Sequence, residues 1–255
     1  KVVQAENKFY AASENALFSY DNQNNQLNTI TTVNGLSGEL ISTLHYSYEY
    51  QLLLIGYENG LIEVYSESDQ EILKVVDIIN KVTIPPSQKK INHFNEFNSQ
   101  IYIATDYGIS VYNLEVLELG DIYYIGSNGS QAPVTQTAIF NNEIYASCRS
   151  NNGIKKANLS NSNLTDFQLW SSITTGNFES VIVSASSIYA VNSSNTIFEI
   201  NGITLNTLFN FSQPVVEINT SETTLLVTTN SKVYQYVSGF NLVNTYSLPT
   251  ELNTL

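Results

Sequence analysis

Short apolar segments alternate with polar turns along the whole chain, and the 3.6-residue apolar spacing of an amphipathic helix is absent. One apolar pattern recurs: an aliphatic residue or Phe, then Tyr or Leu, then an aliphatic residue, then usually a small residue. Its copies are Phe9–Ala12, Leu53–Gly56, Ile101–Ala104, Ile144–Ser147, Ile188–Val191 and Leu225–Thr228. The pattern predicts repeated strands and no helix.

Each copy is followed, after a polar turn, by a second apolar segment. These second segments begin at Leu17, Leu61, Ile109, Ile154, Ile197 and Val233, so successive starts are 44, 48, 45, 43 and 36 residues apart. Propeller repeats have a period of ~40 to 50 residues, with four strands in each blade. The period therefore predicts a β-propeller.

Glycine at the turns indicates hairpins within the repeats. Glu58-Asn59-Gly60, Asp106-Tyr107-Gly108 and Asn151-Asn152-Gly153 each place Gly where a tight turn needs a positive φ. A further strand is predicted before each pair, and another after it, as at 167–170.

The predicted fold is all-β, a single β-propeller domain over 1–255 with about six four-stranded blades. A domain trimmed from a seven-bladed parent would show the same repeats. The predicted blades are approximately 1–34, 35–80, 88–128, 131–172, 177–210 and 213–248. Because blades stack face to face, we expect the repeated tyrosines to pack between them. These are Tyr10, Tyr102, Tyr145 and Tyr189.

Composition excludes several partners. The chain has a net charge of −13 and a single arginine, Arg149, so a nucleic-acid backbone would be repelled. We interpret the doublets Lys89-Lys90 and Lys155-Lys156 as a solvated face. No apolar run approaches the ~18 residues of a membrane helix, so no membrane insertion by this domain is expected.

The single cysteine and the first residue of the chain do not determine the cellular compartment of the protein. Cys148 is alone, so no intrachain disulfide forms, and we expect a buried, inert thiol. The chain begins at Lys1 and contains no Met. Removal of a secretory signal peptide, or cutting from a longer multidomain protein, would both give this start.

Two stretches carry a resemblance to known families. Residues 34–37 read NGLS and residues 53–61 read LLIGYENGL, which resembles the repeat of two-component-regulator propellers, with Leu54 where that family has Trp. The wider order of segments, including KFYAASENALFSYD at 8–21 and IYIATDYGISVYNLE at 101–115, is similar to the N-terminal β-propeller of PorZ-type proteins of the type IX secretion system. The similarity extends from Lys1 to about Ile154.

The resemblance implies an exported protein of the periplasm or cell surface, made with a signal peptide, in which this propeller is the first module. Family members belong to a surface attachment complex, and no catalytic residues are known to carry over. The implied partners are proteins of that complex or a surface glycan.

The sequence contains few of the His, Cys and Arg residues that a catalytic or metal site needs. His45 and His93 stand in what look like matching positions of two innermost strands, but no Cys or carboxylate cluster accompanies them, so we interpret them as structural. An enzymatic propeller needs His, Arg and carboxylates gathered on one face, and two histidines with one arginine hardly provide that set. We expect no enzyme activity, no cofactor and no metal.

A binding face is the remaining prediction. In a propeller, the loops joining second to third strands and the connections between blades emerge on the same face. Exposed aromatic residues beside hydrogen-bonding groups there would suit a glycan or peptide. The residues expected on this face are Asn34, Tyr57, Glu58, Asp106, Tyr107, Asn128 and Arg149.

Three functions stay open at this point. The first is an exported, non-catalytic scaffold or binding module of a PorZ-like secretion protein. The second is the extracytoplasmic, oligosaccharide-binding propeller of a hybrid two-component regulator. A propeller enzyme is the third, and it ranks last for the reasons above.

Overall fold

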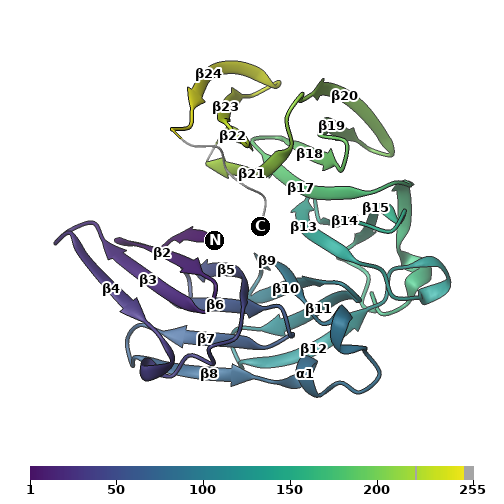
Figure 1. Cartoon of the computed structure of the whole chain (residues 1–255). Helices are drawn as coiled ribbons and strands as arrows, with labels where there is room; N and C mark the ends of the chain where they lie inside the picture. The colour runs from purple at the N-terminus through teal and green to yellow at the C-terminus, as the bar shows by residue number, and fades with distance from the viewer. Residues whose placement is uncertain (222, 250–255) are drawn as a thin grey trace. The chain divides into compact units, whose positions relative to one another are not determined.

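A computed structural model describes residues 1–221 and 223–249, and these form an all-β structure (Figure 1). The chain divides into two compact units, Lys1–Tyr124 and Ile125–Leu255. The described residues form six four-stranded antiparallel sheets, the blades of a β-propeller, as expected. The single domain predicted over 1–255 stays a prediction, and its residues 222 and 250–255 lie outside the described part.

The first unit contains blades 1 to 3, each with its strands in sequence order across the sheet. Blade 1 consists of β1 (Val2–Gln4), β2 (Lys8–Ser13), β3 (Ala16–Asp21) and β4 (Gln26–Ile30). Blade 2 consists of β5 (Ile41–Ser47), β6 (Leu52–Tyr57), β7 (Ile62–Ser66) and β8 (Glu71–Val75). Blade 3 consists of β9 (Ile91–Phe97), β10 (Gln100–Thr105), β11 (Gly108–Asn113) and β12 (Glu118–Tyr123).

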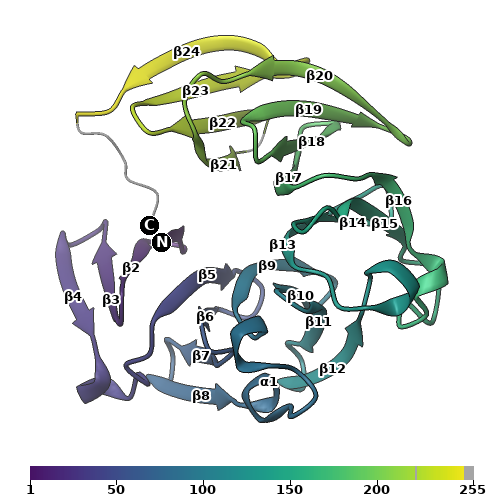
Figure 2. The same cartoon turned by 45° about the vertical axis from the view of Figure 1, so that its right-hand side comes forward.

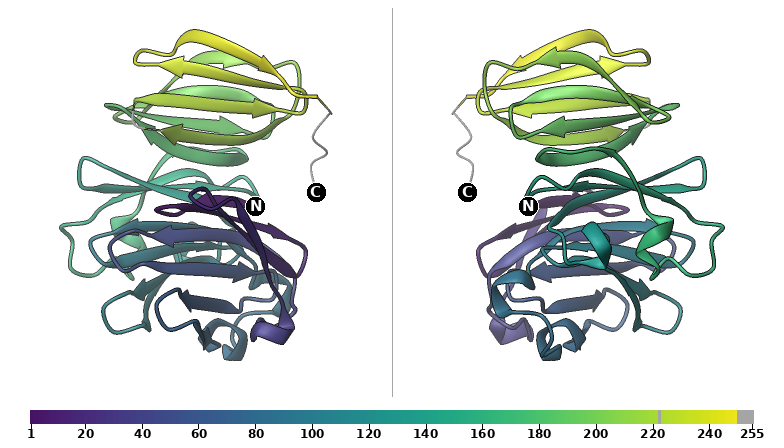
Figure 3. Two further views of the ribbon diagram at one scale, coloured as in Figure 1. Left: turned by 90° about the vertical axis from the view of Figure 1, so that its left-hand side faces the viewer. Right: turned by 90° about the vertical axis from the view of Figure 1, so that its right-hand side faces the viewer.

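The second unit contains blades 4 to 6, built in the same way. Blade 4 consists of β13 (Val134–Phe140), β14 (Glu143–Cys148), β15 (Gly153–Asn158) and β16 (Ser171–Thr174). Blade 5 consists of β17 (Phe178–Ser184), β18 (Ser187–Asn192), β19 (Thr196–Asn201) and β20 (Thr204–Asn210). Blade 6 consists of β21 (Val215–Ser221), β22 (Thr224–Thr229), β23 (Lys232–Val237) and β24 (Asn241–Ser247). Figures 2 and 3 show the green and yellow strands of blades 5 and 6 side by side.

Apolar side chains pack between neighbouring blades of each unit. Between blades 1 and 2 the cluster includes Tyr10, Leu17 and Ile55, and comparable clusters join blades 2 and 3, 4 and 5, and 5 and 6. The expectation for the repeated tyrosines is confirmed for Tyr10, Tyr145 and Tyr189, which belong to these clusters between blades. The exposed fractions of the four tyrosines are 1% at Tyr10, 6% at Tyr102, 4% at Tyr145 and 3% at Tyr189.

The outer strand of blade 4 was placed wrongly from the sequence. Residues Phe167–Leu169 form a 3₁₀ turn, and the strand begins only at Ser171. The Asp166 side chain accepts a hydrogen bond from the Gln168 amide and so caps the turn. Trp170 is buried and donates from Nε1 to the Leu164 carbonyl, so it packs inward just before the strand begins.

The prediction that no helix forms is wrong in one place. The connection from β8 to β9 contains one α-helical turn, α1 (Asp77–Asn80), and a 3₁₀ turn, Pro86–Gln88. Ile78 of α1 is 1% exposed and belongs to the core between blades 2 and 3. A single turn is too short to produce a helical apolar period, so its signal was lost among the repeats.

Candidate functional site

A β-bulge interrupts the first strand of blades 2 to 6 at one common place. In each of these blades, the pairing register between the first and second strands shifts by one residue. The second residue of the first strand therefore has no residue opposite it. The bulged residues are Ser42, Asn92, Thr135, Glu179 and Val216. Bulges are frequent beside functional sites because they redirect a side chain.

The bulges lie at the blade ends that carry the turns after the second strands and the connections entering the first strands. We call this end, in each unit, the bulge face. It is the face on which the binding residues were expected.

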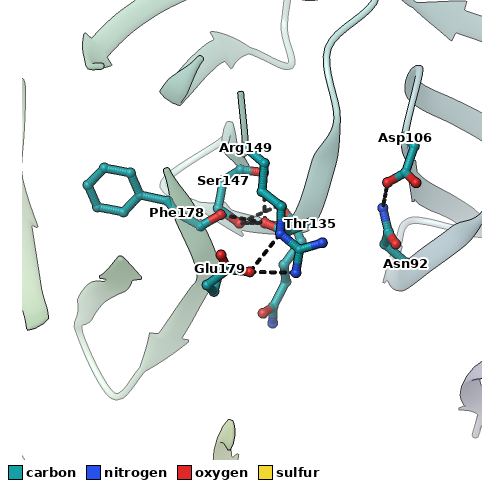
Figure 4. A network of polar contacts seen from close by, with 8 residues as sticks. Asn92, Asp106, Thr135, Ser147, Arg149, Phe178 and Glu179 are labelled. Atoms are coloured by element: carbon teal, nitrogen blue, oxygen red, sulfur yellow. Dashed lines mark hydrogen bonds and ion pairs between the residues drawn. The ribbon is translucent and has the colours of Figure 1, made fainter. Parts of the chain in front are cut away.

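Arg149 and Glu179 form an ion pair on the bulge face of the second unit (Figure 4). Arg149 begins the turn after β14, and Glu179 is the bulged residue of β17. The guanidinium donates to Oε2 of Glu179 from Nε at 2.8 Å and from Nη2 at 2.5 Å. The pair joins blade 4 to blade 5 and leaves about half of the Arg149 side chain exposed.

Thr135 fixes the bulge of blade 4 from inside. Its Oγ1 lies 3.0 Å from the carbonyl oxygens of Ser147 and Phe178 and 2.7 Å from Oγ of Ser147 (Figure 4). All of these groups are buried. The first strands β13 and β17 are therefore held together next to the Arg149–Glu179 pair.

The first unit has a corresponding set of contacts. Nδ2 of the bulged residue Asn92 donates to Oδ1 of Asp106 at 2.8 Å, linking the start of β9 to the turn after β10 (Figure 4). Nζ of Lys90 lies 2.6 Å from Oε1 of Glu58, which links blade 3 to the turn after β6. Charged and amide groups on this face are thus positioned by neighbouring strands.

Two of the expected binding residues are not exposed. Tyr57 is 1% exposed and Tyr107 is 0% exposed, so the expectation of exposed aromatic residues on this face is wrong. The Tyr57 hydroxyl hydrogen-bonds to the buried carboxylate of Glu63, and the Tyr107 hydroxyl lies 2.5 Å from Oγ of Ser110. Both rings turn inward because these hydroxyls find partners inside their own blade.

The other five expected residues do lie in surface turns. Arg149, Asn34 and Asn128 are exposed, and Glu58 and Asp106 are half-buried. Oδ1 of Asn34 accepts the Thr31 amide at 3.1 Å, and Asn128 adopts a left-handed conformation with φ +55°. These two asparagines form turns, whereas Glu58, Asp106 and Arg149 pair with residues that the sequence reasoning had not selected.

The two histidines do not stand in matching positions. His45 lies opposite Leu54 and His93 opposite Ala104, and Ala104 corresponds to Gly56 of blade 2, which faces Thr43. Nε2 of His45 lies 2.8 Å from Oε2 of Glu96, whose Oε1 accepts a hydrogen bond from Ser47.

The pKa values of His93 and Glu96 are both lowered, but for different reasons. Burial lowers the pKa of His93 to about 3, the charge of His45 adds to the fall, and Nδ1 of His93 has no partner. Burial alone would raise the pKa of Glu96, but hydrogen bonds from His45 and Ser47 hold it below its usual value.

Cys148 is completely buried, and burial raises the pKa of its thiol to about 12, which fits the inert thiol expected from the sequence. The solvated face expected for the lysine doublets is wrong for Lys89. Lys89 as a whole residue is 6% exposed, and its Nζ donates to the Ile79 carbonyl at 2.5 Å. Lys156 is mostly buried too, 2.9 Å from Oε1 of Glu143.

Within residues 1–221 and 223–249, no three His, Cys, Asp or Glu side chains are grouped so that they could hold a metal ion. Over the same residues, no helix has the length and apolar character needed to span a membrane. The polar groups of the bulge face can form hydrogen bonds and ion pairs.

Comparison with known proteins adds a family to this geometry. A family model described as the TSS9, PorZ, N-terminal beta-propeller domain matches residues 9–171. No curated protein matches the chain.

Several solved structures share the fold. PorZ, described as an essential bacterial surface component of the type IX secretion system of Porphyromonas gingivalis, matches 97% of this chain and 32% of its own, with a TM-score of 0.81 and 16% identity. The extracellular domain of a putative one-component system from B. thetaiotaomicron matches 98% of this chain and 35% of its own, with a TM-score of 0.71 and 13% identity. The computationally designed protein Ika8 matches 98% of this chain and 75% of its own, with a TM-score of 0.69 and 11% identity.

At these identities the likeness shows the fold alone. The chain spans about a third of the length of the PorZ structure that it matches.

Proposed function

The chain belongs to the family of PorZ N-terminal β-propeller domains, and from that premise we propose that it is a non-catalytic scaffold and binding module of a type IX secretion system. The observation that carries the proposal is the family match over residues 9–171. The shared fold with PorZ over 97% of the chain supports it.

We place the binding surface of this module on the bulge face. Rigid backbone positions the polar groups there, since the bulges fix Asn92 and Glu179 against Asp106 and Arg149. Polar groups that are held in place before binding lose little freedom when a partner arrives. The proposed contacts are Asn34, Glu58, Asp106, Asn128 and Arg149, and the proposed partners are proteins of the surface complex or a surface glycan.

The non-catalytic part of the proposal rests on the state of the reactive groups. The Cys148 thiol is buried with a raised pKa, so it is a poor nucleophile. The charged groups of the bulge face, such as Arg149 and Lys90, are engaged in ion pairs. The module is proposed to be exported and to work in the periplasm or at the cell surface, and the description of PorZ as a bacterial surface component supports this.

One observation favours a second candidate. The extracellular domain of a putative one-component system shares the fold with a TM-score of 0.71. A ligand-sensing propeller that binds an oligosaccharide outside the cytoplasm is therefore kept as the alternative.

Deleting the gene in the bacterium that carries it separates the two candidates. If the chain serves secretion, cargo proteins accumulate inside the cell envelope, and a plasmid copy of the gene restores their release. If cargo release is unchanged while the transcriptional response to an added oligosaccharide disappears, the secretion proposal is wrong and the sensor takes its place.

A further inference from the structure

A groove of about 340 Å³ lies between the outer strands of blades 2 and 3, both within the first unit. Figures 1 and 2 both show β8, α1 and β12 next to one another. Leu73 and Lys74 of β8, Asp77 of α1, Leu117, and Glu118 and Leu119 of β12 line it. Asp77 lies in the connection from β8 to β9 and so borders the bulge face, whereas the other lining residues belong to the outer strands or to the turn before β12.

Leu117 adopts a strained backbone conformation at the edge of this groove. Its φ is +56°, in the left-handed region that a bulky side chain rarely occupies. The same position, the last residue before the outer strand, is Asn25 in blade 1, Gln70 in blade 2 and Phe240 in blade 6, where the Phe240 ring packs against the core between blades 5 and 6. Asparagine tolerates this conformation better than leucine does.

Core packing does not explain the strain. The Leu117 side chain is 36% exposed and is not a member of the core cluster between blades 2 and 3. Strained residues that persist without a packing reason cluster at ligand sites. Leu73 on the opposite side of the groove is also exposed, at 43%.

A buried hydroxyl beside the groove lacks a partner. Tyr112 of β11 is 0% exposed, and its Oη forms no hydrogen bond. Burial, together with the smaller effect of the Asp77 charge, raises the pKa of Tyr112 to about 12. The hydroxyl is therefore within electrostatic reach of a carboxylate that lines the groove.

The groove is acidic as well as apolar. Residues 1–124 contain 16 Asp and Glu against six Lys. The one lysine in the groove, Lys74, has its Nζ 3.6 Å from the buried carboxylate of Glu63. Among the described residues neither Asp77 nor Glu118 forms an ion pair, so both carboxylates remain available to a cation.

We propose that this groove binds an extended segment of a partner protein. A bulky apolar side chain of the segment enters between Leu73 and Leu117, and a flanking lysine or arginine faces Asp77 and Glu118. The outer edges of β8 and β12 also present backbone groups that an added strand can pair with. An acidic segment is repelled by the same carboxylates.

Binding of a synthetic peptide tests the proposal. The probe is a fluorescein-labelled heptapeptide of alternating lysine and leucine. Its binding to the whole chain is measured by fluorescence anisotropy. Replacing both carboxylates, Asp77→Asn with Glu118→Gln, weakens binding about tenfold, the usual scale for removing charges that face a ligand. The matched control, Glu14→Gln with Glu49→Gln, changes two exposed carboxylates elsewhere in the first unit and leaves binding within about twofold.

Equal losses in the two double variants would mean general attraction to an acidic protein, and the proposal would be overturned. A peptide with alanine in place of leucine also has to bind more weakly. If it binds as well as the original peptide, no apolar side chain enters the groove and the proposal fails.

Leu117→Asn gives the sharpest result. Because asparagine relaxes the left-handed backbone, this variant unfolds at a higher temperature than the original chain, and it binds the leucine–lysine peptide about tenfold more weakly. Leu27→Asn, which removes an exposed leucine of β4, is the control and leaves binding unchanged. A lower unfolding temperature for Leu117→Asn would assign the leucine to packing and overturn the proposal, as would unchanged peptide binding.

Discussion

The guanidinium of Arg149 donates two hydrogen bonds to one carboxylate oxygen of Glu179, and this contact spans two blades. Arg149 was selected from the sequence as a binding residue, whereas Glu179 was not. Glu179 points toward Arg149 because it is the bulged residue of β17. The pair therefore links a residue that the sequence identifies to a backbone feature that only the structure reveals.

Glu179→Gln should change stability little. Arg149 is 53% and Glu179 is 32% exposed at the side chain, so water screens their attraction. We expect the free energy of unfolding to fall by at most about 1 kcal/mol in urea titrations. A fall above about 3 kcal/mol would mean that the pair holds the fold together and is not available for binding.

Gly153→Ala should be strongly destabilising. The residue has φ +70°, and an added Cβ would lie 1.8 Å from the Thr174 carbonyl oxygen. We expect a loss of more than about 2 kcal/mol in the free energy of unfolding, measured by chemical denaturation. Gly202→Ala is the matched control, with φ +64° and no atom within 4 Å of the added Cβ. Its expected loss is only about 1 kcal/mol, and equal losses would contradict the steric argument.

Tyr57→Phe should leave a buried carboxylate short of a partner. The Tyr57 hydroxyl donates to Glu63, which is 0% exposed and, among the described residues, forms its one ion pair with Lys74 at 3.6 Å. We expect a loss of about 2 kcal/mol in the free energy of unfolding. Tyr145→Phe removes a similar hydrogen bond to the partly exposed Glu143, which Lys156 also holds, and should lose less than about 1 kcal/mol. The reverse order would show that Tyr57 is not fixed by Glu63.

His93 should make the fold less stable as the pH falls. Its folded-state pKa of about 3 lies below the ordinary value of 6.5, so the unfolded chain binds the proton more readily. The stabilisation is complete above pH 6.5 and is lost as the pH falls toward 3. Between about pH 6.5 and 5, we expect the free energy of unfolding to fall by about 1 to 2 kcal/mol.

His93→Asn should flatten this pH dependence, while His45→Gln should leave most of it, because burial is the larger cause of the His93 shift. Denaturation at several pH values measures both variants. An unchanged slope in His93→Asn would assign the pH dependence to other groups. Glu96 does not interfere in this range, because its pKa lies below its usual value of 4.5 and it titrates at lower pH.

The blades were predictable because their signals are local and repeated. The Tyr-containing second strands and the turn glycines, such as Gly108 and Gly153, recur in sequence, and each corresponds to a real strand or hairpin. The outer strand of blade 4 was misplaced because Phe167 and Trp170 have strand-like composition, although Asp166 caps a 3₁₀ turn there. Apolar character alone does not distinguish a strand from a packed turn.

The site was less predictable for a physical reason. A bulge inserts one residue without a change in composition, so Asn92 and Glu179 carry no sequence signal that separates them from their neighbours. The inward direction of Tyr57 and Tyr107 depends on hydroxyl partners several residues away, at Glu63 and Ser110. A turn aromatic residue therefore predicts a surface position only where no such partner exists.

Hydrogen–deuterium exchange can show whether the bulge face binds a component of the secretion system. The full-length protein is mixed with outer membranes from the bacterium that makes it, and separately with membranes from a strain that lacks the secretion system. We expect slower exchange at residues 57–60, 105–108, 149–153 and 177–180 with the first membranes only. Unchanged exchange at these four segments, or equal protection by both membranes, would contradict the proposal that the bulge face binds such a component.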